Sequence, residues 1–432
     1  MRIMPRLRSD AVLAAVIAVA FLVVSLAISV GVQFVLPIHG WIYATDFFAL
    51  MRDAHIILWG GFGVLYAPGV GQTAHPLGAL SLVPLAEFSS LMHFVEPFPY
   101  PLGRPVIWLW SLGYMSIYMF VYVLSVLFAF RRLGLPKRRR PWVAGASAVL
   151  AGFSLFPWGH PEDVAAMALA LFAFADLLDG RNTRAAYFAG AATAFQPQML
   201  LFLIPLVLMQ VKGVARLASF TARAAVIPLA VALPAMAGDF SGSLSGILTE
   251  AQTGRLRFNR PTLWDSLLQF NHGTISASWF RISMLLIVFL LGLTLRWVWR
   301  ARIVDARTVL VICTLGLSLR AFLEPTEVAY YMSPYLAFGA ITLVGTHPRT
   351  RLAAVGWSAF GLAQLSVAMS RVSALSYSLD LWPLALAGVF ALLIGIPGSK
   401  LSRDIVERGS GVSAPCSLPA SDGKMALEEV SG

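Results

Sequence analysis

Charged residues are scarce in this sequence. Only 12% of the 432 residues are Asp, Glu, Lys or Arg, whereas 58% are hydrophobic and the mean hydropathy is +0.76. A soluble globular chain carries about 25% charged residues. A chain with so little charge cannot cover a water-facing surface of this size, so lipid must be its main solvent. The composition therefore predicts an all-α polytopic membrane protein folded as one compact helix bundle.

Cysteine is also nearly absent, and the common catalytic motifs are missing. Cys313 lies in an apolar run and Cys416 in a polar tail, so the pair offers neither a disulfide framework nor metal-ligand spacing. The seven histidines are scattered along the chain. No P-loop, GxGxxG, HExxH or GxSxG motif occurs. We therefore expect no metal and no cofactor, and no nucleotide or serine-hydrolase chemistry.

The net charge of +11 does not indicate a nucleic-acid partner. The basic residues form short clusters between apolar runs, which is the positive-inside pattern of membrane proteins. The first cluster is Arg2, Arg6 and Arg8, and the uncharged run Ala11 to Leu36 follows it. That run is longer than the apolar core of a signal peptide, about 7–15 residues, so it predicts a retained membrane span.

Ten apolar runs are candidates for membrane spans. They are 11–36, 105–130, 141–157, 162–180, 219–238, 281–299, 307–323, 328–345, 352–371 and 379–397. The segment 185–211 predicts a helix, a break at Gln196-Pro197 and a second helix. Each arm is too short to cross about 30 Å of hydrocarbon alone, so we interpret the segment as a hairpin sheltered by other helices. The expected total is ten to twelve spans.

Charge also predicts the orientation of the bundle. With the N-terminus in the cytoplasm, most of the 32 Lys and Arg residues fall in cytoplasmic loops or in the tail. Counting the apolar run 76–96 as a span would move the basic loop 131–140 outside, so we place 76–96 at the outer face. The prediction is a single domain over 1–408 in the plasma membrane, with both termini cytoplasmic. Its outer loops are 37–104 and 239–280, and 409–432 is a disordered cytoplasmic tail.

The first outer loop contains the strongest catalytic candidate. The stretch 46–58 predicts an amphipathic helix at the membrane surface, with Asp46 and Asp53 on one face and His55 nearby. A partly desolvated carboxylate at such a boundary can act as a general base. The alternative is structural, because Asp46 could simply cap a helix over 47–58. A further histidine, His75, precedes the run that begins at Pro76.

A second candidate is the turn Gly159-His160-Pro161-Glu162-Asp163, between two predicted spans. Proline at the first helical position and acidic residues in the first turn are typical of a helix start. A helix start needs one acidic residue, whereas this turn has His160, Glu162 and Asp163 together. Both interpretations, helix start and substrate-binding site, remain open from the sequence.

Outer-face arginines form the third group of candidates. Arg320 lies near the outer end of an apolar span, where a charged side chain must pair with an opposite charge or face a polar cavity. The simplest partner is Glu324, one helical turn later in the chain. Arg255, Arg257 and Arg260 lie in the second outer loop, against the positive-inside trend. They favour an anionic partner, either lipid headgroups or the phosphate of a lipid-linked substrate.

These pieces, in this order, resemble the GT-C superfamily of glycosyltransferases over about 10–345. The similarity is greatest to the actinobacterial mannosyltransferases that use polyprenol-phosphate-mannose. It rests on five features of the chain. They are Asp46 leading a helix to Gly60-Gly61 and Tyr66, the segment His75-Pro76-Leu77 to Pro84, the turn 159–163, the helix 189–197 broken at Gln196-Pro197, and the turn Glu324-Pro325 to Tyr331. The family usually shows Tyr-Pro-Pro and Lys-Pro where this chain has His75-Pro76-Leu77 and Gln196-Pro197.

The resemblance implies a bundle of GT-C type and an inverting membrane glycosyltransferase. Asp46 would deprotonate the acceptor hydroxyl, and polyprenyl phosphate would leave the sugar. The partners implied are the bilayer, a polyprenyl-phosphate-linked sugar, and a glycolipid or glycan acceptor of the cell envelope. The donor would be mannose, with arabinofuranose as the alternative sugar. A lipid or solute transporter is the alternative class, but it requires polar residues at mid-membrane depth in several spans.

Overall fold

The computed structural model describes residues 4–35, 45–65, 76–92, 105–156, 158–241, 277–298, 305–323, 329–369 and 385–393. These residues are mostly helical and contain no strand. The helices are α1 (Met4–Val35), α2 (Thr45–Gly60), η1 (Phe62–Val64), α3 (Pro76–Leu91), α4 (Pro105–Arg132), η2 (Lys137–Arg139), α5 (Arg140–Leu155), α6 (Pro161–Leu178), α7 (Asn182–Phe195), η3 (Pro197–Met199), α8 (Leu200–Gln210), α9 (Val214–Ala235), α12 (Ala277–Val298), α13 (Ala306–Leu323), η4 (Ala329–Met332), α14 (Ser333–Gly339), the π-helix η5 (Ala340–Val344) and α15 (Thr350–Met369). Residues 385–393 are also helical.

Four of these helices are long and apolar enough to cross a membrane: Arg8–Gly31 in α1, Trp110–Arg132 in α4, Val214–Ala235 and Arg281–Val298. The peripheral helices also expose large apolar side chains, such as Val16 of α1 at 60% and Ile282 of α12 at 56%. Contiguous exposed apolar faces of this kind are uncommon on soluble monomers. The prediction of an all-α membrane protein is confirmed, whereas the number of spans stays a prediction.

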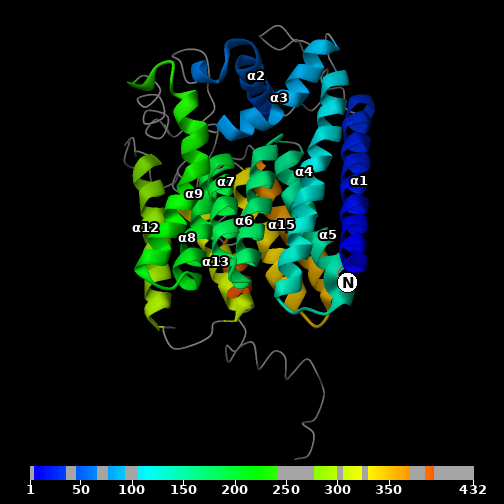
Figure 1. Ribbon diagram of the computed structural model, residues 1–432. Helices are drawn as coiled ribbons and strands as arrows, with labels where there is room; N and C mark the ends of the chain where they lie inside the picture. The colour runs from blue at the N-terminus through cyan, green and yellow to red at the C-terminus, as the bar shows by residue number, and fades with distance from the viewer. Residues whose placement is uncertain are drawn as a thin grey trace, which may run out of the picture.

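Ion pairs and hydrogen bonds gather the basic loops at one end of the bundle, called here the basic end. Asp10 of α1 pairs with Arg131 and Arg140, which joins the start of α1 to the α4–α5 connection. Arg132 pairs with Asp179 at the end of α6, with 2.7 Å between Nη2 and Oδ2. The N-terminus lies at this end in Figure 1. The clustering agrees with the loops that the sequence groups together, since all of these residues lie in predicted cytoplasmic segments or beside them.

Helices α2 and α3 pack together at the opposite end, above α6 and α7 in Figure 1. The hydroxyls of Tyr114 and Tyr118 on α4 donate to the backbone oxygen and the hydroxyl of Ser81 on α3, at 2.6 Å and 2.8 Å. The backbone N–H of Gly238, just beyond α9, donates to the oxygen of Gly63 at 3.0 Å. The apolar run that begins at Pro76 therefore lies with α2 at the end opposite the basic end, and its location at the outer face stays a prediction.

Helices α7 and α8 form the hairpin that the sequence predicts. Helix α7 starts at the basic end, where Arg184 pairs with Asp176 of α6, and α8 returns there, since Arg296 donates to the oxygen of Val211 at 2.9 Å. Close contacts at two glycines hold both helices of the hairpin against neighbouring helices. A Cβ on Gly190 of α7 would lie 2.1 Å from the backbone oxygen of Ala224 on α9, and one on Gly316 of α13 would lie 2.2 Å from that of Leu201 on α8. Small residues permit such close helix crossings in membranes.

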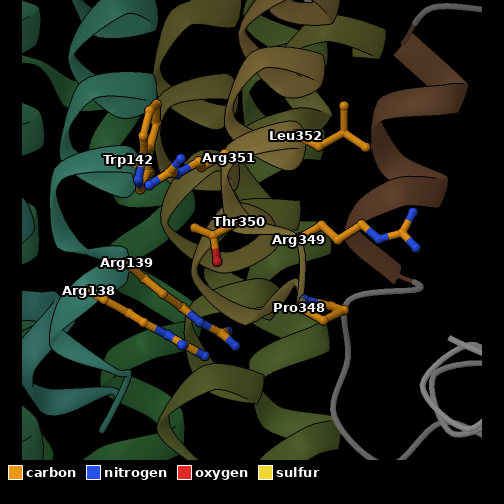
Figure 2. A pocket seen from close by; sticks show the side chains of 8 residues that line it. All are labelled: Arg138, Arg139, Trp142, Pro348, Arg349, Thr350, Arg351 and Leu352. Carbon is orange, nitrogen blue, oxygen red and sulfur yellow. The ribbon is translucent and has the colours of Figure 1, made fainter. Parts of the chain in front are cut away.

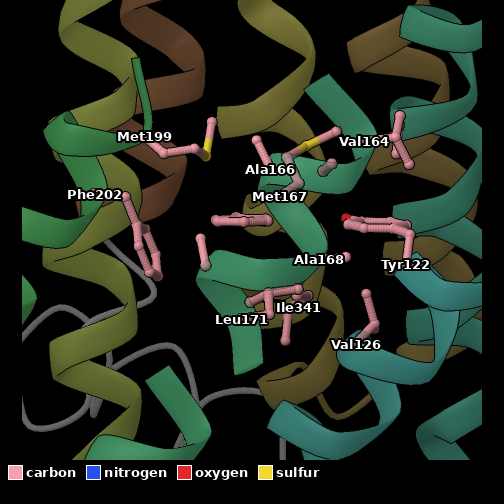
Figure 3. Packing of buried hydrophobic residues seen from close by; sticks show 14 of the residues in the cluster. Tyr122, Val126, Val164, Ala166, Met167, Ala168, Leu171, Met199, Phe202 and Ile341 are labelled. Atoms are coloured by element: carbon pink, nitrogen blue, oxygen red, sulfur yellow. The ribbon is translucent and has the colours of Figure 1, made fainter. Parts of the chain in front are cut away.

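The apolar core surrounds α6 and the hairpin (Figure 3). Ten of its buried side chains are labelled there: Tyr122, Val126, Val164, Ala166, Met167, Ala168, Leu171, Met199, Phe202 and Ile341. The ring of Phe202 on α8 lies edge-on to Phe338 of α14, with 5.0 Å between centroids. Because the core encloses α6 on several sides, it holds the first turn of α6 in a fixed position.

The glycine contacts predict opposite effects for two identical substitutions. Gly316→Ala places a Cβ against the backbone oxygen of Leu201, so we expect a loss of about 1–3 kcal/mol of stability, as overpacking usually costs. Gly356 in the middle of α15 is exposed and has no atom within 4 Å of its Cβ position. Gly356→Ala is expected to be neutral or stabilising, by about 0.5–1 kcal/mol. Melting temperatures in detergent measure both, and equal melting temperatures for the two variants would contradict the close crossing.

Candidate functional site

The first turn of α6 is positioned by the turn that precedes it. Gly159 adopts φ +76°, a left-handed conformation that favours glycine, and its N–H donates to the oxygen of Leu155 at 3.0 Å. The N–H of His160 then donates to the oxygen of Ser154 at 2.8 Å. Pro161 occupies the first turn of the helix, where its missing N–H costs nothing. The backbone thus delivers His160, Glu162 and Asp163 to one buried place.

The side chains of this turn contact one another and the hairpin, and none of them caps α6. His160 Nδ1 lies 2.6 Å from Glu162 Oε1. Gln196 Nε2 donates to Asp163 Oδ1 at 2.6 Å, and Gln198 Nε2 lies 3.4 Å from the same oxygen. The residue before the helix makes no side-chain cap hydrogen bond. The helix-start interpretation therefore accounts for Pro161, while Asp163 makes tertiary contacts with the hairpin and Glu162 contacts His160 of the same turn.

Arg320 joins the same group from α13. Its guanidinium is buried, donates to Gln198 Oε1 and lies over the ring of Tyr331, 3.4 Å from the centroid. We call His160, Glu162, Asp163, Gln196, Gln198, Arg320 and Tyr331 the polar cluster. It contains two carboxylates and one guanidinium, and His160 adds a positive charge only when it is protonated.

Two oxygens of the polar cluster are buried without a hydrogen-bond partner among the described residues. They are Glu162 Oε2 and Asp163 Oδ2. Most buried polar atoms in proteins have a partner, and a carboxylate oxygen can only accept. The cluster therefore presents acceptors to a ligand that carries donors, and hydroxyl groups satisfy this condition.

Helices α2 and α3 adjoin the cluster. A Cβ on Gly78 of α3 would lie 3.2 Å from Glu162 Cβ and 3.4 Å from Leu50 Cδ2 of α2, so α2, α3 and α6 meet at this point. Asp46 is the second residue of α2, one helical turn before Leu50. The helix begins at Thr45, so Asp46 belongs to its first turn and does not precede a helix over 47–58; its side chain lies outside the described part of the structure.

The other α2 candidates are held by local contacts. Asp53 is fully buried and lies 3.2 Å from Nη2 of Arg52. His55 Nδ1 donates to the oxygen of Met51 at 2.9 Å, and its ring packs at a tilt against Trp59 with 5.0 Å between centroids. These contacts support the helix, and they give neither residue a defined place in the polar cluster.

The structure thus unites part of the predicted site. His160, Glu162, Asp163 and Arg320 come together from α6 and α13. The candidates outside the described residues are His75, Arg255, Arg257, Arg260 and Glu324. Gln196, Gln198 and Tyr331 were not among the predicted site residues. An amide within an apolar hairpin is a signal for Gln198, because a polar group at that depth needs a partner.

No protein-family model matches the chain, and no curated protein matches it either. The similarity to GT-C glycosyltransferases therefore stays a prediction from the sequence. Within the described ranges, no group of three or more His, Cys, Asp or Glu side chains is arranged to hold a metal ion.

Proposed function

We propose that this chain is a membrane glycosyltransferase of GT-C type, with ten to twelve spans and both termini in the cytoplasm. It transfers a sugar, mannose ahead of arabinofuranose, from a polyprenyl-phosphate donor to a glycolipid or polysaccharide acceptor of the cell envelope. The reaction takes place on the extracytoplasmic face and inverts the anomeric centre.

The observation that carries the proposal is the pair of unpartnered, buried carboxylate oxygens, Glu162 Oε2 and Asp163 Oδ2. Sugars carry many hydroxyl donors, and hydrogen bonds to a charged acceptor are the strong ones. The described cluster contains more carboxylate than guanidinium, so it suits the hydroxyls of a sugar better than a phosphate. The phosphate of the donor is assigned to Arg255, Arg257 and Arg260 of the outer loop, which stabilise the leaving group.

Asp46 is the proposed general base. It lies on α2, whose Leu50 adjoins Glu162 through Gly78, so the start of α2 is near the cluster. In the proposed step the acceptor hydroxyl gives its proton to the Asp46 carboxylate and its oxygen attacks the anomeric carbon. The bond from that carbon to the phosphate oxygen breaks, and its electron pair leaves with polyprenyl phosphate.

A lipid-borne donor fits a site at the α2–α3 end of an apolar bundle. Nucleotide sugars are cytoplasmic, so an outward-facing enzyme needs a sugar that arrives already activated on lipid. The exposed apolar faces of α1 and α12 place the bundle in the same medium as a polyprenyl chain.

Transfer is tested with purified protein in lipid nanodiscs. Polyprenyl-phosphate-mannose and polyprenyl-phosphate-arabinose, each radiolabelled, are supplied in turn with a lipid-glycan extract as acceptor. We expect label to move from one donor to the extract, with mannose the better substrate. Transfer from arabinose alone would reassign the sugar. No transfer from either donor, together with transport of a labelled donor across the bilayer of sealed proteoliposomes, would contradict the enzyme.

Membrane orientation has a separate test. Reporter fusions in the loop 131–140 and in the tail after residue 408 are both expected to report the cytoplasm, because the basic end gathers most of the described arginines. A fusion between residues 92 and 105 is expected to report the opposite side. A periplasmic signal from the loop 131–140 would contradict both the orientation and the outward-facing site.

A further inference from the structure

A cavity of about 430 Å³ lies at the basic end, between the start of α5 and the loop that joins η5 to α15 (Figure 2). Arg138 and Arg139 line it from η2, Trp142 from α5, Arg349 from the loop before α15, and Thr350 and Arg351 from the start of α15. This volume is within the usual range for small-ligand pockets. The polar cluster lies at the opposite end, so the cavity has no part in the proposed transfer.

The cavity is strongly positive. Four arginines line it, and no carboxylate in the described part of the chain pairs with any of them. Arg139 donates to the backbone oxygen of Gly345 at 2.8 Å, so its guanidinium is held in place. Burial and the like charges of Arg138 and Arg307 lower the pKa of Arg139. Arginines gathered in this way repel one another, and a bound anion relieves that repulsion.

The rim of the cavity is apolar on the side of α15. Arg351 lies over the ring of Trp142, with 5.3 Å between its Cζ and the centroid, and Figure 2 shows the two side chains together. Leu352 and Val355 lie on one face of α15, each 63% exposed. Tryptophan is enriched at the membrane–water interface, where an apolar body meets a polar layer. The cavity thus places cationic donors next to a lipid-facing surface.

We propose that this cavity binds the phosphate group of an anionic phospholipid from the leaflet at the basic end. Arg138, Arg139 and Arg351 donate to the phosphate oxygens, since guanidinium groups match phosphate geometry. The acyl chains lie along Leu352 and Val355. A free phosphate ion shares the headgroup chemistry but cannot use this apolar face.

The test titrates the purified full-length chain in detergent with phosphatidylglycerol or phosphatidylcholine and counts bound lipid by native mass spectrometry. We expect phosphatidylglycerol to bind about tenfold more tightly, as expected for charge-assisted contacts. Arg138→Gln with Arg351→Gln should remove that preference. Arg216→Gln removes one exposed charge at the same end, outside the cavity, and should keep it. Equal binding of both lipids, or equal loss in Arg216→Gln, would overturn the proposal.

Two further measurements distinguish a lipid phosphate from a free phosphate ion, and a lost contact from a loss of folding. Inorganic phosphate at the same concentration should not displace phosphatidylglycerol; displacement would assign the cavity to a phosphate ion and overturn the lipid assignment. Arg351→Lys keeps the charge and the stem, and we expect partial retention of the preference because the planar fork is lost. If the double variant fails to fold, the single variant Arg138→Gln is expected to weaken binding severalfold, and unchanged binding would overturn the proposal.

Discussion

Asp46→Asn is expected to lower sugar transfer by about 10²–10⁴-fold, the usual contribution of a positioned general base. The substitution removes the basic carboxylate and keeps the shape of the side chain. Inside the first turn of a helix, this change removes only the interaction of a carboxylate with the helix dipole, about 0.3–1 kcal/mol. If Asp46 only supports the first turn of α2, Asp46→Asn should therefore leave transfer almost unchanged. The single substitution separates the catalytic role from the structural one.

Asp53→Asn on the same helix is the control for stability. Asp53 is fully buried and pairs with the partly exposed Arg52, so replacing its carboxylate with an amide removes the charge of this ion pair and should lower the melting temperature. The rate of sugar transfer per folded molecule should stay unchanged. The two variants are measured for kcat/KM with the radiolabelled donor and for melting temperature in detergent. Full transfer by Asp46→Asn would remove Asp46 as the base.

The helices were predictable because each apolar run is local in the sequence. Runs such as 105–130 and 281–299 correspond to α4 and α12, and the break at Gln196-Pro197 corresponds to the turn between α7 and α8. The distribution of charge excluded the run after Pro76 from the spans and placed it at the outer face, because six basic residues in 131–140 would otherwise have changed sides. The structure places this run beside α2, at the end of the bundle opposite the basic end. These inferences needed only the length and hydropathy of segments and the position of charges between them.

The partners within the site were harder to predict because they depend on tertiary packing. The sequence suggests Glu324, one turn away, as the partner of Arg320, and that pairing lies outside the described residues. The structure also brings Gln198 to Arg320 from the hairpin, 122 positions earlier in the chain. The periodicity of apolar residues shows which face of a helix is buried, but it does not show which other helix that face contacts. The approach of α8 to α13 depends on Gly316, which has no side chain and leaves no hydropathy signal of its own.

The acidic pair of the polar cluster yields the second large effect. In Asp163→Asn, one side-chain oxygen can still accept from Gln196, but the atom at the Oδ2 position becomes a donor. A substrate hydroxyl that donates to Asp163 Oδ2 loses its acceptor. Glu162→Gln changes the oxygen that has no partner among the described residues in the same way. A hydrogen bond to a charged group contributes about 1.5–3 kcal/mol, so each variant should lose about 10–150-fold in kcat/KM.

Asp176→Asn is the matched control for both variants. Asp176 is fully buried in the same helix, but it lies at the basic end and pairs with Arg184. We expect this substitution to lower the melting temperature while transfer per folded molecule stays unchanged. Asp163→Asn should show the opposite pattern, a nearly unchanged melting temperature and a loss of kcat/KM. If Asp163→Asn instead lowers the melting temperature and keeps full transfer, the polar cluster only joins α6, the hairpin and α13, and the sugar must bind elsewhere.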